Sequence, residues 1–249
     1  MKKALFIILT LFVMLTMNAC FLLFVGNETE SSSNENITTK TEKSAENYEI
    51  ISSSVKTYKN SIGITWAQAI VEVENTGSSN LFLHSGTCDL EDLDGNLIAS
   101  KSISVFPQII APGEKAFYYD EYILDTLAEP IELKIIPRPE IVKSSSKHIT
   151  CPVTDISITD YALGGIKVMG RVENTSESEE SLIYVAVVLF NEDSEPIGLV
   201  YTILADGLAT GEKVGFEATA LSLPSDVTAD SVASYTAVAY PYQFQIDFY

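Results

Sequence analysis

The sequence contains few of the residues that build metal centres and catalytic sites. Its 249 residues include two histidines, three cysteines and one tryptophan. His84 and His148 are far apart, and neither has a second histidine or a cysteine pair at metal-binding spacing. A G-x-S-x-G nucleophile motif and a glycine-rich phosphate loop are also missing. We therefore expect a protein without metal or other cofactor, and not an enzyme.

Basic residues are also scarce. Lysine and arginine number 15 against 34 acidic residues, which gives a formal net charge of −19. Such a chain repels phosphate groups, so we expect no nucleic-acid partner. The densest acidic stretch, residues 89–96, does not follow the calcium-loop pattern, because Leu90 and Lys101 stand where the first and last ligands belong. Its Asp94-Gly95 pair predicts a hairpin turn with outward-facing carboxylates instead.

What the sequence does contain is an internal repeat. Val-Glu-Asn-Thr occurs at residues 73–76 and again at 172–175, and Gly-Glu-Lys occurs at 113–115 and again at 211–213. Two landmarks in the same order, with a spacing of about 100 residues, indicate two copies of one module of ordinary domain size. We interpret the shared motif residues as structural; they are Asn75, Thr76, Gly113, Glu114, Asn174, Thr175, Gly211 and Glu212.

Both copies have the pattern of short strands separated by turns. Apolar residues alternate along segments such as 131–136, and the apolar segment 182–190 is the strongest predicted strand. Helical periodicity is nearly absent, which predicts an all-β fold of two tandem β-sandwiches. The expected boundaries are 48–137 for the first domain, 138–152 for a serine- and proline-containing linker, and 153–249 for the second domain.

The N-terminal segment has the features of an export signal, because two lysines precede an apolar run within residues 1–25. Ala19-Cys20 resembles a bacterial lipoprotein signal, in which Cys20 would be lipidated. The run is also long enough for a membrane-anchoring helix, and cleavage with release is a third alternative. Residues 26–47 are polar and predict a disordered tether. All three alternatives place the modules outside the cytoplasm, and the first two hold them at the membrane.

The order of motifs in each copy resembles the FxLYD module of bacterial surface proteins. In the second copy, residues 187–191 (V-V-L-F-N) occupy the position of the naming motif, with the leucine matching and phenylalanine replacing tyrosine. In the first copy, residues 88–92 (C-D-L-E-D) occupy it, with the leucine and the final aspartate matching. The resemblance covers most of residues 60–125 and 160–220. It implies immunoglobulin-like sandwiches at the surface of a Gram-positive bacterium, and it implies no activity because the family has no agreed ligand.

Two cysteines lie outside the N-terminal segment, Cys88 and Cys151. Outside the cytoplasm they are candidates for a disulfide that would tie a strand of the first module to the entry of the second. The alternative is two unpaired thiols, because sequence alone does not show whether their Cα atoms approach within bonding range.

Tyrosines are frequent in the predicted strands. Examples are Tyr118, Tyr119, Tyr122, Tyr240, Tyr242 and Tyr249, and Phe244 and Phe248 add further aromatic side chains. Exposed tyrosines suit protein or carbohydrate contacts, but strands are enriched in aromatic residues in any case, so we favour packing in the core.

These observations favour a membrane-tethered, non-catalytic binding or interaction module with an unknown protein or glycan partner. A structural spacer of the cell envelope without a specific ligand is the alternative. An enzyme is the third hypothesis, and it would require a concave pocket with convergent polar groups.

Overall fold

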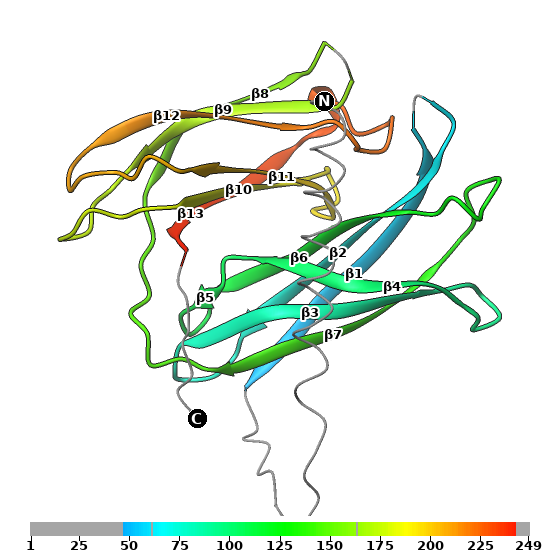
Figure 1. Cartoon of the computed structure of the whole chain (residues 1–249), viewed down its shortest axis with the longest axis horizontal. Helices are drawn as coiled ribbons and strands as arrows, with labels where there is room; N and C mark the ends of the chain where they lie inside the picture. The colour runs from blue at the N-terminus through cyan, green and yellow to red at the C-terminus, as the bar shows by residue number, and fades with distance from the viewer. Residues whose placement is uncertain (1–46, 61, 163, 243–249) are drawn as a thin grey trace, which may run out of the picture. The chain divides into compact units, whose positions relative to one another are not determined.

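The computed structural model describes residues 47–60, 62–162 and 164–242, all of which lie in one compact unit (Figure 1). The expected all-β fold is confirmed for these residues, in which every strand pairing is antiparallel and the one helical element is a 3-10 turn, η1 (Ala229–Ser231).

Several predictions for the chain termini lie outside the described residues. These are the export or anchor segment at residues 1–25, the candidate lipidation site Cys20, the tether up to residue 46, and the end of the second domain after residue 242. Within the described part of the chain, no helix has the length and apolar character needed to cross a membrane.

The first half of the described chain forms a sheet that folds into two layers. One layer contains β1, β2 and β6, and the other contains β3, β5 and β7. Strand β4 belongs to both, because its residues 97–103 pair with β3 whereas residues 104–106 pair with β6. The strands are β1 (Tyr48–Lys59), β2 (Thr65–Asn75), β3 (Leu81–Glu91), β4 (Leu97–Phe106), β5 (Ile109–Ile110), β6 (Lys115–Ile123) and β7 (Lys134–Lys143).

The second half forms two separate three-stranded sheets with the equivalent strand order. Strand order β12-β9-β8 corresponds to β6-β2-β1, and β11-β10-β13 corresponds to β4-β3-β7. An isolated bridge between Glu180 and Leu208 repeats the pairing of Leu81 with Ile110. The strands are β8 (Val153–Asp160), β9 (Ile166–Glu173), β10 (Ile183–Phe190), β11 (Pro196–Leu204), β12 (Lys213–Ala220) and β13 (Ser234–Pro241).

Each half has its own apolar core between its two layers, as alternation along the strands requires. In β10 the residues at odd positions, from Ile183 to Leu189, lie in the core of the second half. The residues at even positions are also apolar and face the other way. This explains the unbroken apolar run of this strand, since a strand with both faces covered does not alternate.

A third apolar cluster covers that second face and joins the two halves. Buried residues of β2, β4 and β6 pack there against buried residues of β10, β11 and β13; they are Ile70, Phe106, Phe117, Tyr119, Ala186, Val188, Leu199 and Tyr240. The Tyr240 hydroxyl donates a hydrogen bond to the backbone oxygen of Val105 across this contact, at 3.4 Å. The halves therefore meet through sheet faces as well as through the connecting chain.

The boundary predicted after residue 137 is corrected by β7. This strand continues through Pro139 to Lys143, inside the segment predicted as linker. Prolines are tolerated there because β7 is an edge strand that pairs only with β3, so their missing N–H groups cost no ladder bond. The connection between the halves therefore begins after Lys143.

Candidate binding cleft

The repeated motif forms a buried hydrogen-bond cluster in the first half. Asn75 is fully buried, and its side-chain amide donates to the backbone oxygens of Ser79 and Ile110 at 2.9 and 3.1 Å. Its backbone oxygen accepts from Gly113 N–H at 2.8 Å, and its own N–H donates to Glu114 O at 2.9 Å. One side chain thus fastens three chain segments at the end of the sandwich.

The second half repeats this cluster bond for bond. The Asn174 amide donates to Ser178 O and Leu208 O at 2.8 and 2.7 Å. Its backbone exchanges bonds with Gly211 and Glu212 at 2.7 and 3.0 Å. Gly113 and Gly211 also share a positive φ, of 79° and 77°, which explains glycine in both turns. The motif residues therefore hold loops together, as the structural interpretation predicts.

The candidate disulfide is not formed. Cys88 and Cys151 are both free and buried, and they lie in the separate cores of the two halves. Alternation along β3 turns Cys88 inward, which is why it cannot reach the connecting segment. Burial raises the pKa of both thiols above its ordinary value, so neither is an activated nucleophile.

The predicted packing role is confirmed for four of the aromatic residues, whereas Tyr242 is half-buried and Phe244, Phe248 and Tyr249 lie outside the described residues. Tyr118 and Tyr122 lie in the core of the first half. Tyr119 and Tyr240 lie in the cluster between the halves, with only 6% and 5% of their surface exposed. These four side chains are therefore not available as an exposed contact surface.

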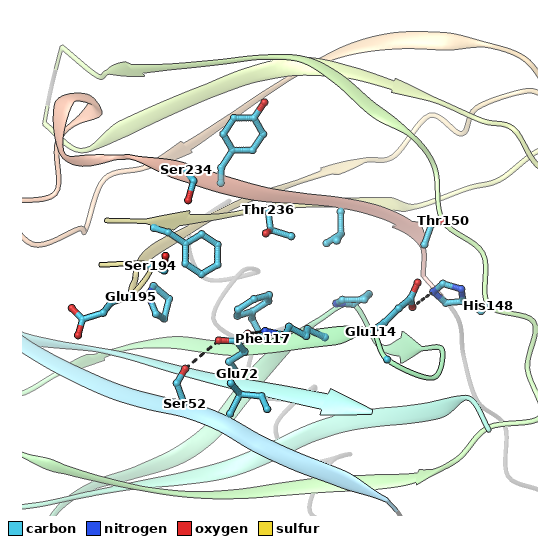
Figure 2. Close-up of a pocket in the computed structure, with 18 residues that line it drawn as sticks. Ser52, Glu72, Glu114, Phe117, His148, Thr150, Ser194, Glu195, Ser234 and Thr236 are labelled. Carbon is cyan, nitrogen blue, oxygen red and sulfur yellow. Dashed lines mark hydrogen bonds and ion pairs between the residues drawn. The ribbon is translucent and has the colours of Figure 1, made fainter. Parts of the chain in front are cut away.

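A cleft opens along one side of the contact between the halves (Figure 2). Its volume is about 760 Å³, which is within the range of small-molecule and peptide sites. The first half contributes residues of β1, β2 and β6, and the second half contributes residues of β10, β11 and β13. The main lining side chains are Ser52, Glu72, Glu114, Lys115, Phe117, His148, Phe190, Glu195, Tyr235, Thr236 and Val238.

The floor of the cleft is apolar. The rings of Phe117 and Phe190 meet edge to face, with centroids 6.1 Å apart and an interplanar angle of 69°. Val238 completes this surface from the neighbouring strand β13. Phe117 and Phe190 also belong to the cluster between the halves, so the floor is supported from behind and is held in place without a ligand.

The polar side chains of the cleft form one salt bridge and one contact between a histidine and a carboxylate. Lys115 Nζ lies 2.6 Å from Glu72 Oε1, and the Ser52 hydroxyl donates to the other oxygen of this carboxylate at 3.3 Å. His148 Nε2 lies 2.9 Å from Glu114 Oε2 at one end of the cleft. Figure 2 shows Glu195 at the opposite end. Three carboxylates therefore face one lysine and one histidine.

The Glu114 pair is the point at which the two copies of the motif diverge. Glu114 and Glu212 each accept a hydrogen bond from the backbone N–H of the alanine three residues earlier, at 2.9 Å. Only Glu114 also meets a histidine, because the chain between the halves brings His148 beside it. The repeat thus supplies one wall of the cleft, and the connecting segment supplies its end.

The arrangement is suited to binding. Among the described residues, no group of three histidine, cysteine or acidic side chains is placed to hold a metal ion. Of the predicted motif residues, only Gly113 and Glu114 line the cleft. The sequence did not identify Phe117, Phe190 and Val238 as site residues, because each occupies an ordinary apolar position within a predicted strand.

No protein-family model and no curated protein matches this chain.

Proposed function

We propose that this protein is a non-catalytic binding protein of the bacterial cell surface, with its ligand site in the cleft between the two halves. The observation that carries the proposal is the preformed apolar floor of Phe117, Phe190 and Val238 with charged groups around it. A few placed polar groups over an apolar surface are what ligand sites share.

The two halves are proposed to be immunoglobulin-like modules of the FxLYD type, held outside the membrane by the N-terminal segment. The matched strand order and the duplicated asparagine cluster support two copies of one module. The intact mass of protein extracted from host membranes tests the anchoring. An acylated species that begins at Cys20 indicates a lipoprotein, a mass that retains the first lysines indicates a helix anchor, and absence from membranes contradicts tethering.

The competing function is a structural spacer of the cell envelope without a specific ligand. A spacer of this kind would not require the cleft. The test applies the full chain to arrays of glycans and of short peptides, beside the variant Thr236→Trp, which fills the cleft. The control is Thr159→Trp, at an exposed position of β8 outside the cleft. We expect ligands that bind the wild type and the control but not Thr236→Trp. If no ligand distinguishes the two tryptophan variants, the cleft is not the binding site.

A further inference from the structure

Strand β13 presents an open edge to the cleft. It pairs with β10 on one side, and on the other side no described strand pairs with it. The N–H of Tyr242 donates to Leu182 O, so the backbone at even-numbered positions is directed towards β10. Because backbone direction alternates along an antiparallel strand, the N–H and C=O groups of Tyr235 and Ala237 point to the open edge.

The chain itself uses the far end of this edge. Cys151 N–H donates to the backbone oxygen of Ala239 at 2.7 Å, just after the connecting segment passes His148 and Thr150. The segment leaves the edge there, and residues 234–238 remain open to the cleft. An edge that already accepts one extended segment has the geometry to accept another beside it.

Residues 234–238 of this edge lack the features that protect exposed strands from pairing, because the one proline of β13, Pro241, lies at the far end of the strand. Charged side chains and prolines usually block such edges. Among the edge strands longer than two residues, β1, β7, β8 and β12 each carry at least two charged residues, whereas β11 and β13 carry none. Strand β11 lies against β12, so the edge of β13 is the uncharged one that faces the cleft.

The surroundings decide what can pair there. The edge lies inside a cleft whose opposite wall carries Glu72, labelled in Figure 2, and Lys115. A second folded copy would have to bring a whole sheet into this space, whereas a single extended chain requires the width of one strand. The open residues span about 17 Å, which corresponds to a segment of about five residues.

We propose that the ligand of the cleft is an extended peptide that adds as a strand to the open edge of β13. This inference rests on the proposed binding function. The peptide would have apolar side chains at alternate positions, because one face of the added strand lies over Phe117 and Phe190. It would carry positive charge near its ends, where Glu114 and Glu195 lie. The net charge of −19 favours the same cationic partner.

The probe is a displayed library of random peptides of about seven residues, which cover the open edge with a margin at each end. The library is selected on the full chain, and affinities of the enriched peptides are measured by fluorescence anisotropy. Each peptide is then synthesised in two versions, which we call the two phases. One phase carries methyl groups on the backbone nitrogens of its odd positions, and the other carries them on those of its even positions. We expect one phase to lose about tenfold or more in affinity and the other to be nearly unchanged, because only alternate N–H groups face β13.

The matched protein variants are Tyr235→Pro and Tyr235→Ala. Both remove a side chain that is 47% exposed, but only proline removes the outward N–H. We expect Tyr235→Pro to weaken peptide binding about tenfold relative to Tyr235→Ala. The methylated peptides leave the protein unchanged, so they decide the question even if the proline variant folds poorly.

Other outcomes would overturn strand addition. Equal binding of both methylated phases would mean that side chains alone hold the peptide; the cleft would remain the binding site. Enrichment of glycans but no peptides would retain the proposed function and reject this ligand. A dimer of the full chain that Tyr235→Pro dissociates would identify a second copy as the occupant.

Discussion

At the scale of single residues, the duplicated asparagine holds equivalent loops together in both halves. Asn75 and Asn174 are both fully buried, and the side-chain amide of each donates to backbone oxygens in two other segments. A buried group that loses its partner keeps its desolvation cost, so short polar side chains of this kind are difficult to replace. This is a physical reason for the same tetrapeptide to occur twice.

We expect Asn75→Ala to lower the free energy of unfolding by about 1–3 kcal/mol, because it leaves the oxygens of Ser79 and Ile110 without their donor. Urea unfolding followed by circular dichroism measures the change. Asn174→Ala should cost a similar amount. The control is Asn96→Ala, which removes only a solvent-exposed hydrogen bond to Asp92 within a turn, with an expected change of about 0.5 kcal/mol. Equal effects of Asn75→Ala and Asn96→Ala would contradict the structural role of the motif.

A second residue-scale prediction concerns acid. Asp89 is buried; the Ser100 hydroxyl donates to its carboxylate at 2.6 Å, and Arg138 pairs with it. The Ser100 hydrogen bond, together with Arg138, holds the pKa of Asp89 below its ordinary value. A lowered pKa means that the stabilisation is complete above the unfolded-state pKa of about 3.9 and is lost as pH falls through the folded-state pKa.

We therefore expect the stability difference between wild type and Asp89→Asn to be constant near neutral pH and to shrink below about pH 5. Urea unfolding at a series of pH values measures it. Arg138→Met removes one partner of Asp89 and leaves the Ser100 hydrogen bond. This variant should therefore reduce the pH dependence of the stability difference without abolishing it. If this stability difference grew as the pH fell, folding would raise the pKa of Asp89 and not lower it, and the prediction would be wrong.

At the scale of elements, the pairing of β3 with β7 depends on a close approach. Their register shifts between His84 and Thr87, and a Cβ atom placed on Gly86 would lie 2.7 Å from the backbone oxygen of Arg138. We expect Gly86→Ala to destabilise the protein by about 1–3 kcal/mol, because the backbone of β3 or of β7 must move to make room for the added methyl group. In the control Gly215→Ala, the new Cβ meets nothing closer than 3.8 Å. Thermal unfolding compares the two, and similar midpoints would contradict a tight β3–β7 contact.

The strands were predictable from sequence to different degrees. Alternation and turn residues indicate the sandwich layers, and the apolar run of β10 predicts a strong strand, but its burial on both faces became clear only from the structure. What covers the second face was not predictable, because a run such as Ala116 to Tyr119 in β6 shows that both faces are covered but does not show which strand of the other half covers them. The cleft follows from this contact and so has no signal of its own. The prolines of β7 also led us to place the domain boundary too early, after residue 137, because an edge strand tolerates proline.

At the scale of the whole molecule, the apolar cluster between the halves should make them unfold together. Polar contacts add to it, since the Tyr58 hydroxyl donates to the backbone oxygen of Ser222 and Lys56 pairs with Asp226. The cleft depends on this union because each half supplies one wall. A ligand that touches both walls would stabilise the closed arrangement by mass action.

Ile70 tests this coupling, because it lies in the first half and is buried in the apolar cluster that joins the two halves. We expect Ile70→Ala to cost about 2–5 kcal/mol and to reduce amide hydrogen-exchange protection in β9 and β10 as well as in β2. The control Ile51→Ala, at a position 42% exposed, should leave both halves protected. If Ile70→Ala had little effect on β9 and β10, the halves would be energetically independent. The cleft would then lack a fixed second wall, and strand addition at β13 would have to proceed on an exposed edge.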